Sequence, residues 1–195
     1  MPRDLESASF AHVRTAFLDR DGVINEKAPE GEYVGSWAAF HILPGVPEAI
    51  ARLNRAGILA IVVSNQRGIA KGLYTAHEVF AMHAEFERLL AGCEARIDGF
   101  FFCPHDVNSC RCRKPLPGLF EQAAAAFPSI GAESSVMIGD SMVDVEFARG
   151  LAMPAIFIEG PPGRQKADVA AAAEMADRRV ASLAEAVDLL LAGRV

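Results

Sequence analysis

The amino-acid sequence predicts an α/β fold with three layers, in which helices cover both faces of a parallel sheet. Short apolar runs alternate along the chain with longer segments in which apolar residues recur with helical periodicity. The short runs are apolar almost throughout, which is typical of strands buried on both faces. Alternation of this kind favours a parallel sheet packed between two layers of helices.

Five apolar runs are predicted to be strands, and five periodic segments are predicted to be helices. The strands are Thr15–Leu18, Ile58–Val63, Gly99–Phe102, Ser135–Ile138 and Ala155–Ile158. The helices are Val46–Ala56, Thr75–Leu90, Leu119–Phe127, Val143–Arg149 and Ser182–Leu191. Pro44 and Gly45 precede the first helix and Gly57 follows it, as expected at helix ends.

Length and composition limit the classes of protein that fit. The chain has 195 residues, 51% hydrophobic and 23% charged, so we expect one globular domain over residues 1–195. The net charge of −6 gives no support to binding of nucleic acids or anionic membranes. The sequence has neither a run of about 20 apolar residues nor a secretory signal at its start. We therefore expect a cytoplasmic protein, and a monomer, because nothing marks an association surface.

Polar side chains stand at the ends of the predicted strands, where open parallel sheets bind their ligands. They follow the first, second and fourth strands, and a lysine lies a few residues beyond the third. These residues are Asp19, Asp21, Ser64, Asn65, Gln66, Lys114, Asp140 and Asp144. The sequence therefore predicts that they meet in one cleft.

Asp19 and Asp21 follow the first strand in a D-x-D-G motif. Residues two apart in an extended segment face the same way, so we expect both carboxylates on one side. Like charges this close favour a shared cation, and Mg²⁺ prefers such oxygen ligands. Asp19 could then attack phosphorus, while Asp21 protonates the leaving alkoxide and later deprotonates water. Alternatively, the motif is only a turn with Gly22 at positive φ.

The other two strand ends carry complementary groups. The hydroxyl and amides of Ser64–Gln66 suit phosphoryl oxygens, although this segment could equally be a polar loop. Asp140 would supply a third carboxylate to the metal, or it could cap the following helix. Asp144 lies one helical turn later and could orient neighbours, including Lys114.

Three cysteines and a histidine lie close together as Cys103, His105, Cys110 and Cys112. In a cytosolic chain this spacing indicates a metal site, and the Cys₃His set is typical of a closed structural zinc site. Four protein ligands leave no position for a reactive water, so a structural role fits better than a catalytic one. The alternative is a group of thiols without a metal. Cys93 lies outside the set and is expected to be a core residue at a helix end.

The combination of D-x-D-G, S-N-Q, a lysine and G-D-x-x-x-D resembles the haloacid dehalogenase superfamily over about residues 14–190. The resemblance implies a Rossmann-like three-layer fold and magnesium-dependent phosphoryl transfer. It implies that Asp19 is the nucleophile and Asp21 the general acid and base. It further implies that Ser64 and Lys114 bind the phosphoryl group and that Asp140 completes the Mg²⁺ ligands. An aspartate two residues after the nucleophile is the version associated with phosphatases and phosphomutases.

The cysteine cluster narrows the resemblance to a zinc-loop subgroup. Cys-Pro-His followed by Cys-x-Cys-Arg-Lys-Pro is similar to heptose 1,7-bisphosphate 7-phosphatases and histidinol-phosphate phosphatases. In both, the zinc loop (about residues 103–112) holds the Arg113–Lys114 pair against the substrate phosphate. Residues 64–72 resemble the heptose enzymes more closely. The zinc loop is shorter than in that pattern, and residues 25–43 are longer and approach the histidinol type.

The sequence therefore predicts a phosphatase for a small sugar phosphate, preferably heptose 1,7-bisphosphate. Asn65, Gln66 and Arg113 are expected to bind substrate. Histidinol phosphate is the alternative substrate, a mutase is less expected, and a zinc-stabilised binding module is the non-enzymatic alternative.

Without room for a large cap domain, only residues 25–43 and the zinc loop can cover the site. Tyr33, Trp37 and Phe40 could line the cleft or form the core of that covering segment.

Overall fold

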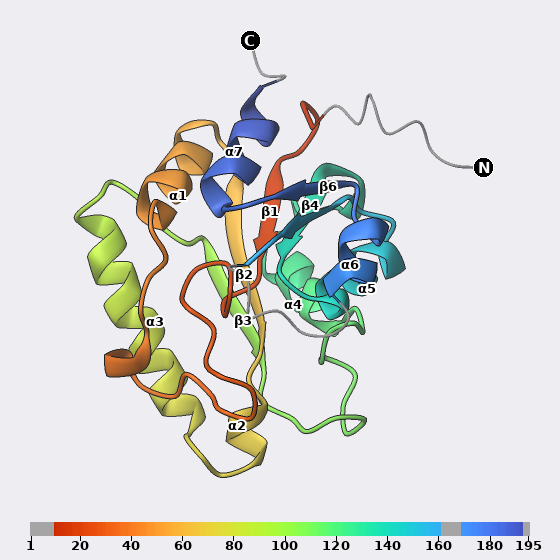
Figure 1. The fold of residues 1–195 in the computed structure, drawn as a ribbon. Helices are drawn as coiled ribbons and strands as arrows, with labels where there is room; N and C mark the ends of the chain where they lie inside the picture. Colours follow the sequence, from red (N-terminus) through yellow and green to blue (C-terminus); the bar gives the residue numbers. More distant parts are fainter. Residues whose placement is uncertain (1–9, 161–168, 193–195) are drawn as a thin grey trace.

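The computed structural model describes residues 10–160 and 169–192. They form a sheet whose neighbouring strands are all parallel, in the order β3-β2-β1-β4-β5-β6 (Figure 1). The strands are β1 Thr15–Leu18, β2 Leu59–Asn65, β3 Gly99–Cys103, β4 Ser135–Gly139, β5 Ala155–Ile158 and β6 Arg178–Val180. The predicted parallel sheet is confirmed.

Helices lie on both faces of this sheet, as predicted. They are α1 Val46–Arg55, α2 Arg67–Ala70, α3 Ala76–Ala91, α4 Gly118–Ala126, α5 Met142–Gly150, α6 Val169–Met175 and α7 Leu183–Leu191, with 3-10 turns at Trp37–Ala39 and Ala132–Ser134. Helices α1, α3 and α7 lie on one side of the sheet in Figure 1, and α4, α5 and α6 lie on the other. Each face has its own hydrophobic core.

The alternation of side chains along the strands explains why the strand sequences are continuously apolar. In β1, Ala16 and Leu18 belong to the core beneath α1, α3 and α7, whereas Phe17 belongs to the core beneath α4, α5 and α6. All three residues are 0% exposed. Burial on both faces therefore favours apolar residues at the interior positions of the strand.

The predicted helices match to within one residue at either end, but three short elements were not predicted. Strand β6 has three residues, two of them arginines, and α2 has four residues within a polar segment. Helix α6 is mainly alanine, so it shows no clear apolar stripe. Strand β2 continues to Asn65, so Ser64 and Asn65 end the strand instead of following it.

Residues 25–43, here called the flap, lie between β1 and α1 at the carboxyl edge of the sheet (Figure 1). The Glu26 N–H donates to the His41 carbonyl at 2.7 Å, and Asn25 forms an antiparallel bridge with Ile42. Phe40 is 5% exposed, stacks on Trp37 with centroids 5.3 Å apart, and contacts Phe86 of α3. These contacts support the core alternative for the flap aromatics.

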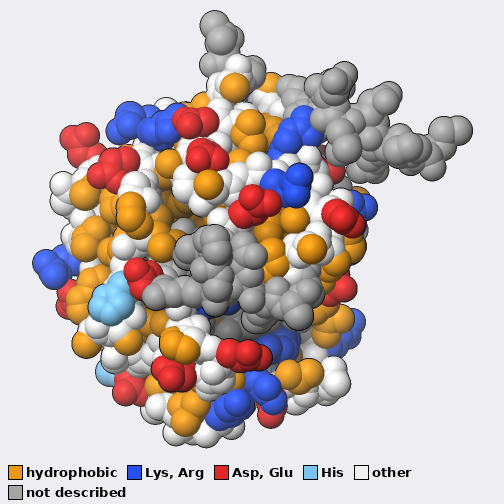
Figure 2. Space-filling view, in the orientation of Figure 1, with side chains coloured by type: hydrophobic (Ala, Val, Ile, Leu, Met, Phe, Trp, Pro, Cys, Tyr) orange, Lys and Arg blue, Asp and Glu red, His pale blue; other side chains and the backbone are white. Residues whose placement is uncertain are grey.

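No inserted cap domain interrupts the described residues, as expected from the sequence. Within the same residues, no helix has the length and apolar character to span a membrane. On the face drawn in Figure 2, Lys and Arg side chains lie among Asp and Glu side chains. The charge on this face is therefore mixed in sign.

Candidate active site

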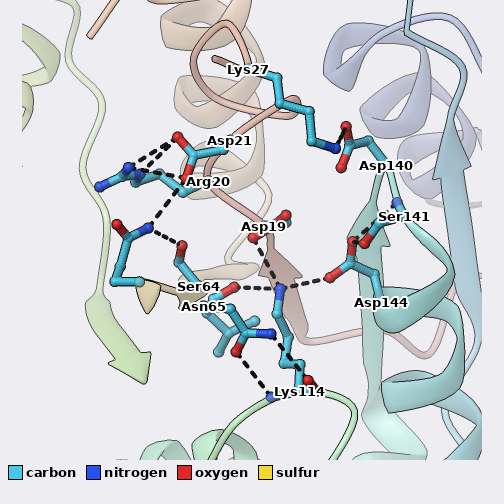
Figure 3. Close-up of polar contacts among 12 residues, drawn as sticks. Asp19, Arg20, Asp21, Lys27, Ser64, Asn65, Lys114, Asp140, Ser141 and Asp144 are labelled. Carbon is cyan, nitrogen blue, oxygen red and sulfur yellow. Dashed lines mark hydrogen bonds and ion pairs between the residues drawn. The ribbon is translucent and has the colours of Figure 1, made fainter. Parts of the chain in front are cut away.

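The carboxyl ends of β1, β2 and β4 bring together side chains that are far apart in the sequence (Figure 3). Asp19 follows β1, Ser64 ends β2, and Asp140 follows β4. Lys114 reaches the same place from the segment between β3 and α4. We find the predicted convergence of these residues at one edge of the sheet.

Lys114 is at the centre of the site and is 3% exposed. Its Nζ donates to Asp19 Oδ1 at 3.0 Å, to Asp144 Oδ1 at 2.6 Å and to the Val63 carbonyl at 2.8 Å. Burial opposes the charged form, but Asp144 and Asp19 outweigh it and raise the pKa of Lys114. Lys114 is therefore a fixed ammonium ion with an acceptor for each of its three N–H groups.

Asp144 has the orienting role that its position suggested. Its Oδ1 accepts from Lys114, while its Oδ2 accepts from the Ser141 hydroxyl at 2.5 Å and from the Ser141 N–H at 3.2 Å. A Cβ on Gly139 would lie 2.3 Å from the Asp144 Cβ, so glycine allows this close approach. The N-cap of α5 is Ser141, so the alternative that Asp140 caps this helix is wrong.

Asn65 holds the backbone of Lys114. Its Oδ1 accepts from the Lys114 N–H at 3.0 Å, and its Nδ2 donates to the Lys114 carbonyl at 3.0 Å. Both ends of the amide are therefore engaged by the residue that carries the central ammonium. This geometry favours a positioning role for Asn65 over the substrate contact expected from the sequence.

The Asp21 carboxylate points away from Asp19, toward Arg20 (Figure 3). Arg20 Nη2 donates to both Asp21 oxygens at 3.0 Å, and Asn25 Nδ2 donates to Oδ1 at 2.9 Å. The i, i+2 argument fails because β1 ends at Leu18 and the chain turns immediately afterwards. The Asp21 carboxylate lies outside the cluster formed by Asp19, Asp140 and Asp144, so this geometry does not favour the expected metal ion shared by the Asp19 and Asp21 carboxylates.

Gln66 is 1% exposed and connects several of the polar groups. Its Nε2 donates to Ser64 Oγ at 2.6 Å and to Asp21 Oδ2 at 3.2 Å, while its Oε1 accepts from the Tyr74 hydroxyl at 2.7 Å. Burial raises the pKa of Tyr74 to about 12, so this hydroxyl stays a donor. As for Asn65, these contacts favour a positioning role for Gln66 over the predicted substrate contact.

Two basic residues of the site were not singled out in the sequence, Arg20 and Lys27. Arg20 is 1% exposed, donates to the Val34 carbonyl of the flap at 3.0 Å and lies over the Phe40 ring. Lys27 Nζ lies 2.5 Å from Asp140 Oδ2. The only indication of Arg20 in the sequence is its place between the two aspartates. Lys27 has no such indication, because its partner Asp140 is 113 residues away.

Asp140 is nearly buried and closely packed. Its Oδ1 has no hydrogen-bond partner within residues 10–160 and 169–192. Gly22, at φ 101°, lies so close that an added Cβ would be 2.1 Å from Asp140 Oδ2. Burial raises the pKa of Asp140 to about 7, and Asp19 adds to this although Lys27 opposes it. A buried carboxylate oxygen without a donor is suited to a cation.

The carboxylates fit a divalent ion. Asp19, Asp140 and Asp144 each offer an oxygen, and these oxygens lie within 4.8 Å of one another. Both oxygens of Asp144 already accept hydrogen bonds, from Lys114 and from Ser141, so Asp19 and Asp140 are the better candidates for metal ligands. Hard oxygen ligands of this kind are those that Mg²⁺ selects.

The four zinc-loop residues form a second cluster that could hold a metal ion. The three cysteines are free of disulfides, and the sulfur and nitrogen atoms of the set are 3.3–3.7 Å apart. Bonds of about 2.3 Å from sulfur to a tetrahedral zinc ion separate the ligands by roughly 3.8 Å, so the set has suitable dimensions. Burial raises the pKa of the Cys103 thiol to about 12, and a cation would be needed to hold it as thiolate.

Arg113 follows directly after this cluster and is half-buried. Its Nη1 is buried and has no partner in the described part of the chain. Arg67 of α2 contacts the loop as well, with Nε 2.5 Å from Asp106 Oδ1. The zinc loop is therefore connected to α2 by the ion pair between Arg67 and Asp106, and to Lys114 by the intervening residue Arg113.

Comparison with known proteins agrees with this architecture. A family model described as haloacid dehalogenase-like hydrolase matches residues 3–151. A Mycobacterium tuberculosis protein named D-glycero-alpha-D-manno-heptose-1,7-bisphosphate 7-phosphatase is 39% identical to this chain. The match covers 74% of this chain and 76% of the length of the relative. A Rhodopseudomonas palustris protein, named as the corresponding enzyme for the beta form, is 38% identical over 79% and 88%.

Solved structures give the same result. The heptose 1,7-bisphosphate phosphatase of B. bronchiseptica, complexed with magnesium and phosphate, has a TM-score of 0.77 and 29% sequence identity. The match covers 92% of this chain and 99% of the B. bronchiseptica chain. The Burkholderia thailandensis enzyme has a TM-score of 0.65 at 31% identity, with 91% and 98% covered. The resemblance seen in the sequence is confirmed, and the chain belongs to the haloacid dehalogenase-like hydrolases.

Proposed function

We propose that this protein is a magnesium-dependent phosphatase that removes the 7-phosphate of D-glycero-D-manno-heptose 1,7-bisphosphate through a phospho-aspartate on Asp19. The observation that carries the chemistry is the buried Lys114 ammonium, 3.0 Å from Asp19 Oδ1. A phosphoryl group bound here would contact both the Asp19 carboxylate, as nucleophile, and the Lys114 ammonium, which stabilises its negative charge. The names of the two relatives described above support the choice of substrate.

In the first step, a carboxylate oxygen of Asp19 attacks phosphorus, and the bond from phosphorus to the sugar oxygen breaks. The leaving alkoxide would take a proton from the protonated carboxyl group of Asp21, after this group has turned from Arg20 toward Asp19. In the second step, Asp21 takes a proton from water, and the water oxygen attacks phosphorus. The bond from phosphorus to the Asp19 oxygen breaks, which releases phosphate and restores the Asp19 carboxylate. Arg20, Asn25 and Gln66 hold the Asp21 side chain beside the flap.

Other groups of the chain would bind the phosphoryl oxygens. Lys114 supplies the fixed charge, and the Ser64 hydroxyl can donate its proton because its oxygen already accepts from Gln66. Asp19 and Asp140 would hold Mg²⁺, which when bound neutralises the carboxylates and the phosphoryl charge. The magnesium in the B. bronchiseptica complex supports this assignment.

Zinc is the metal we propose for Cys103, His105, Cys110 and Cys112. The Cys112 ligand is two residues from Lys114, so a filled site would restrain the backbone that Asn65 holds from the other side. Zinc would then act on catalysis by placing Arg113 and Lys114.

The proposal is tested by turnover of purified protein with Mg²⁺ on the α and β anomers of heptose 1,7-bisphosphate, histidinol phosphate and other sugar phosphates. We expect one heptose anomer to be preferred, with the 7-phosphate released, and an Asp19→Asn variant to be inactive. The relatives include enzymes for both anomers, so the panel decides between them. Faster turnover of histidinol phosphate would refute the substrate, and activity in Asp19→Asn would refute the phospho-aspartate.

A further inference from the structure

Lys27 brings a second ammonium group to the carboxylates that we assign to Mg²⁺. Its Nζ is 2.5 Å from Asp140 Oδ2, and the Lys27 and Asp140 side chains are 24% and 9% exposed. Figure 3 shows Lys27 entering from the flap, on the opposite side of Asp19 from Lys114. The two lysines therefore lie on either side of the proposed nucleophile.

The backbone next to Lys27 is firmly held, so this placement is a property of the fold. Asn25 is 0% exposed, and its Nδ2 donates to Asp21 Oδ1 at 2.9 Å and to the Glu26 carbonyl at 2.8 Å. The Glu26 N–H is bonded to the His41 carbonyl on the other strand of the flap. Lys27 thus extends from an anchored base toward the carboxylates.

Lys27 is charged at this position. Its ammonium group is paired directly with the Asp140 carboxylate. Unlike Lys114, whose three N–H groups all have acceptors, Lys27 has Asp140 as its one hydrogen-bond partner among residues 10–160 and 169–192. Two of its N–H groups therefore have no acceptor within the described part of the chain.

The charges of the cluster show what this second lysine changes. When all three carboxylates are ionised, they and the two ammonium groups carry a net charge of about −1, and a divalent cation would make the cluster about +1. Without Lys27 the same ion would leave the cluster neutral. Because a phosphate monoester is a dianion at neutral pH, it gains more from a positive cluster than from a neutral one.

We propose that Lys27 is a second phosphoryl-binding cation, which weakens Mg²⁺ binding at Asp140 and strengthens binding of the phosphate group. The inference rests on the proposed phosphatase activity of the site but not on the identity of the sugar. Its distinguishing feature is that removing one charge should change the two affinities in opposite directions. Loss of a purely structural residue would weaken both.

The test is isothermal titration calorimetry, first with Mg²⁺ and then with inorganic phosphate added to the Mg²⁺-saturated protein. For Lys27→Met we expect the Kd for Mg²⁺ to fall about tenfold and the Kd for phosphate to rise about tenfold, the scale for one partly exposed charge a few ångströms away. Lys27→Arg keeps the charge and should stay close to wild type. Lys71→Met is the matched control, since it removes one ammonium that lies over the Tyr33 ring.

Opposite shifts in Lys27→Met, absent in Lys71→Met, would support the proposal. Weaker binding of both ions would mean that Lys27 only holds the flap, and unchanged binding of both would mean that its charge is irrelevant. Equal shifts in Lys71→Met would reduce the effect to net charge; each of these three results overturns the proposal. Neither titration uses a sugar, so the result does not depend on which substrate is correct. If the wild-type protein binds no Mg²⁺, both this inference and the proposed metal requirement are refuted.

Discussion

Replacing His83 with phenylalanine should make the stability of the protein less dependent on pH. His83 lies in α3, is 4% exposed and stacks on Phe100 with ring centroids 4.2 Å apart. Neither ring nitrogen has a hydrogen-bond partner among the described residues. Burial, with a smaller contribution from the charge of Arg20, lowers the pKa of His83 from 6.5 to about 3.

The sign of the effect follows from proton binding in the two states. Below pH 6.5 the unfolded chain protonates His83, while the folded protein does not until about pH 3. The unfolded state therefore binds more protons, and stability falls as the pH decreases through this window. Between pH 7 and pH 5 this one group should reduce the free energy of unfolding by about 2 kcal/mol.

Urea unfolding of wild type and His83→Phe at pH 7, 6 and 5 measures this contribution. Carboxylates and metal ligands titrate in both proteins, so the informative quantity is the difference between the two pH profiles. We expect wild type to lose about 2 kcal/mol more than the variant between pH 7 and pH 5. Parallel profiles would refute the conclusion that His83 is buried in its neutral form.

Three other changes test the positioning of the site. Asn65→Ala should lower kcat about tenfold or more with a smaller change in KM, because it releases the Lys114 backbone; a rise in KM alone would restore the substrate-binding role. Gly22→Ala should weaken Mg²⁺ affinity about tenfold in a titration, since its Cβ would collide with Asp140, and unchanged affinity would contradict this. Zinc removal by a chelator, or Cys110→Ser, should lower the Tm and the activity; if chelation changes neither, the loop needs no metal.

The sheet could be predicted because both of its faces are buried. Residues such as Phe17 and Leu18 face opposite cores, which makes each strand a continuous apolar run that is easily distinguished from its surroundings. Strand β6 and helix α2 lack that signal because they have only three and four residues, and β6, which pairs with β5, contains two arginines. Strand ends were thus predictable to within two residues, and with them the place of the site.

The partners of the site residues were harder to predict than the residues themselves. Asp19 and Asp140 stand at strand ends that the apolar pattern marks, but Lys27 and Arg20 are charged residues in an irregular segment. Nothing in the sequence indicates that Lys27 meets a carboxylate 113 residues away. The orientation of Asp21 differs from the expectation for a local reason: β1 ends at Leu18, so Asp19 and Asp21 do not lie in an extended segment.

Three carboxylates of the proposed site are each paired with a cation: Asp19 with Lys114, Asp21 with Arg20 and Asp140 with Lys27. Lys114 is shared, because it also pairs with Asp144. Ion pairs with buried partners stabilise a fold poorly, because desolvation offsets much of the attraction, so we infer that these pairs serve catalysis. Lys114→Met alone should lower the free energy of unfolding by about 3 kcal/mol, since Asp144, 1% exposed, loses its cation.

The double variant Lys114→Met/Asp144→Leu should recover most of that loss, because it removes the unpaired charge together with its partner. Both variants should be inactive. Urea unfolding, with turnover measured on the same samples, separates the two effects. If the double variant is no more stable than Lys114→Met, then this buried pair contributes to the stability of the fold, and the argument that it is retained for catalysis fails.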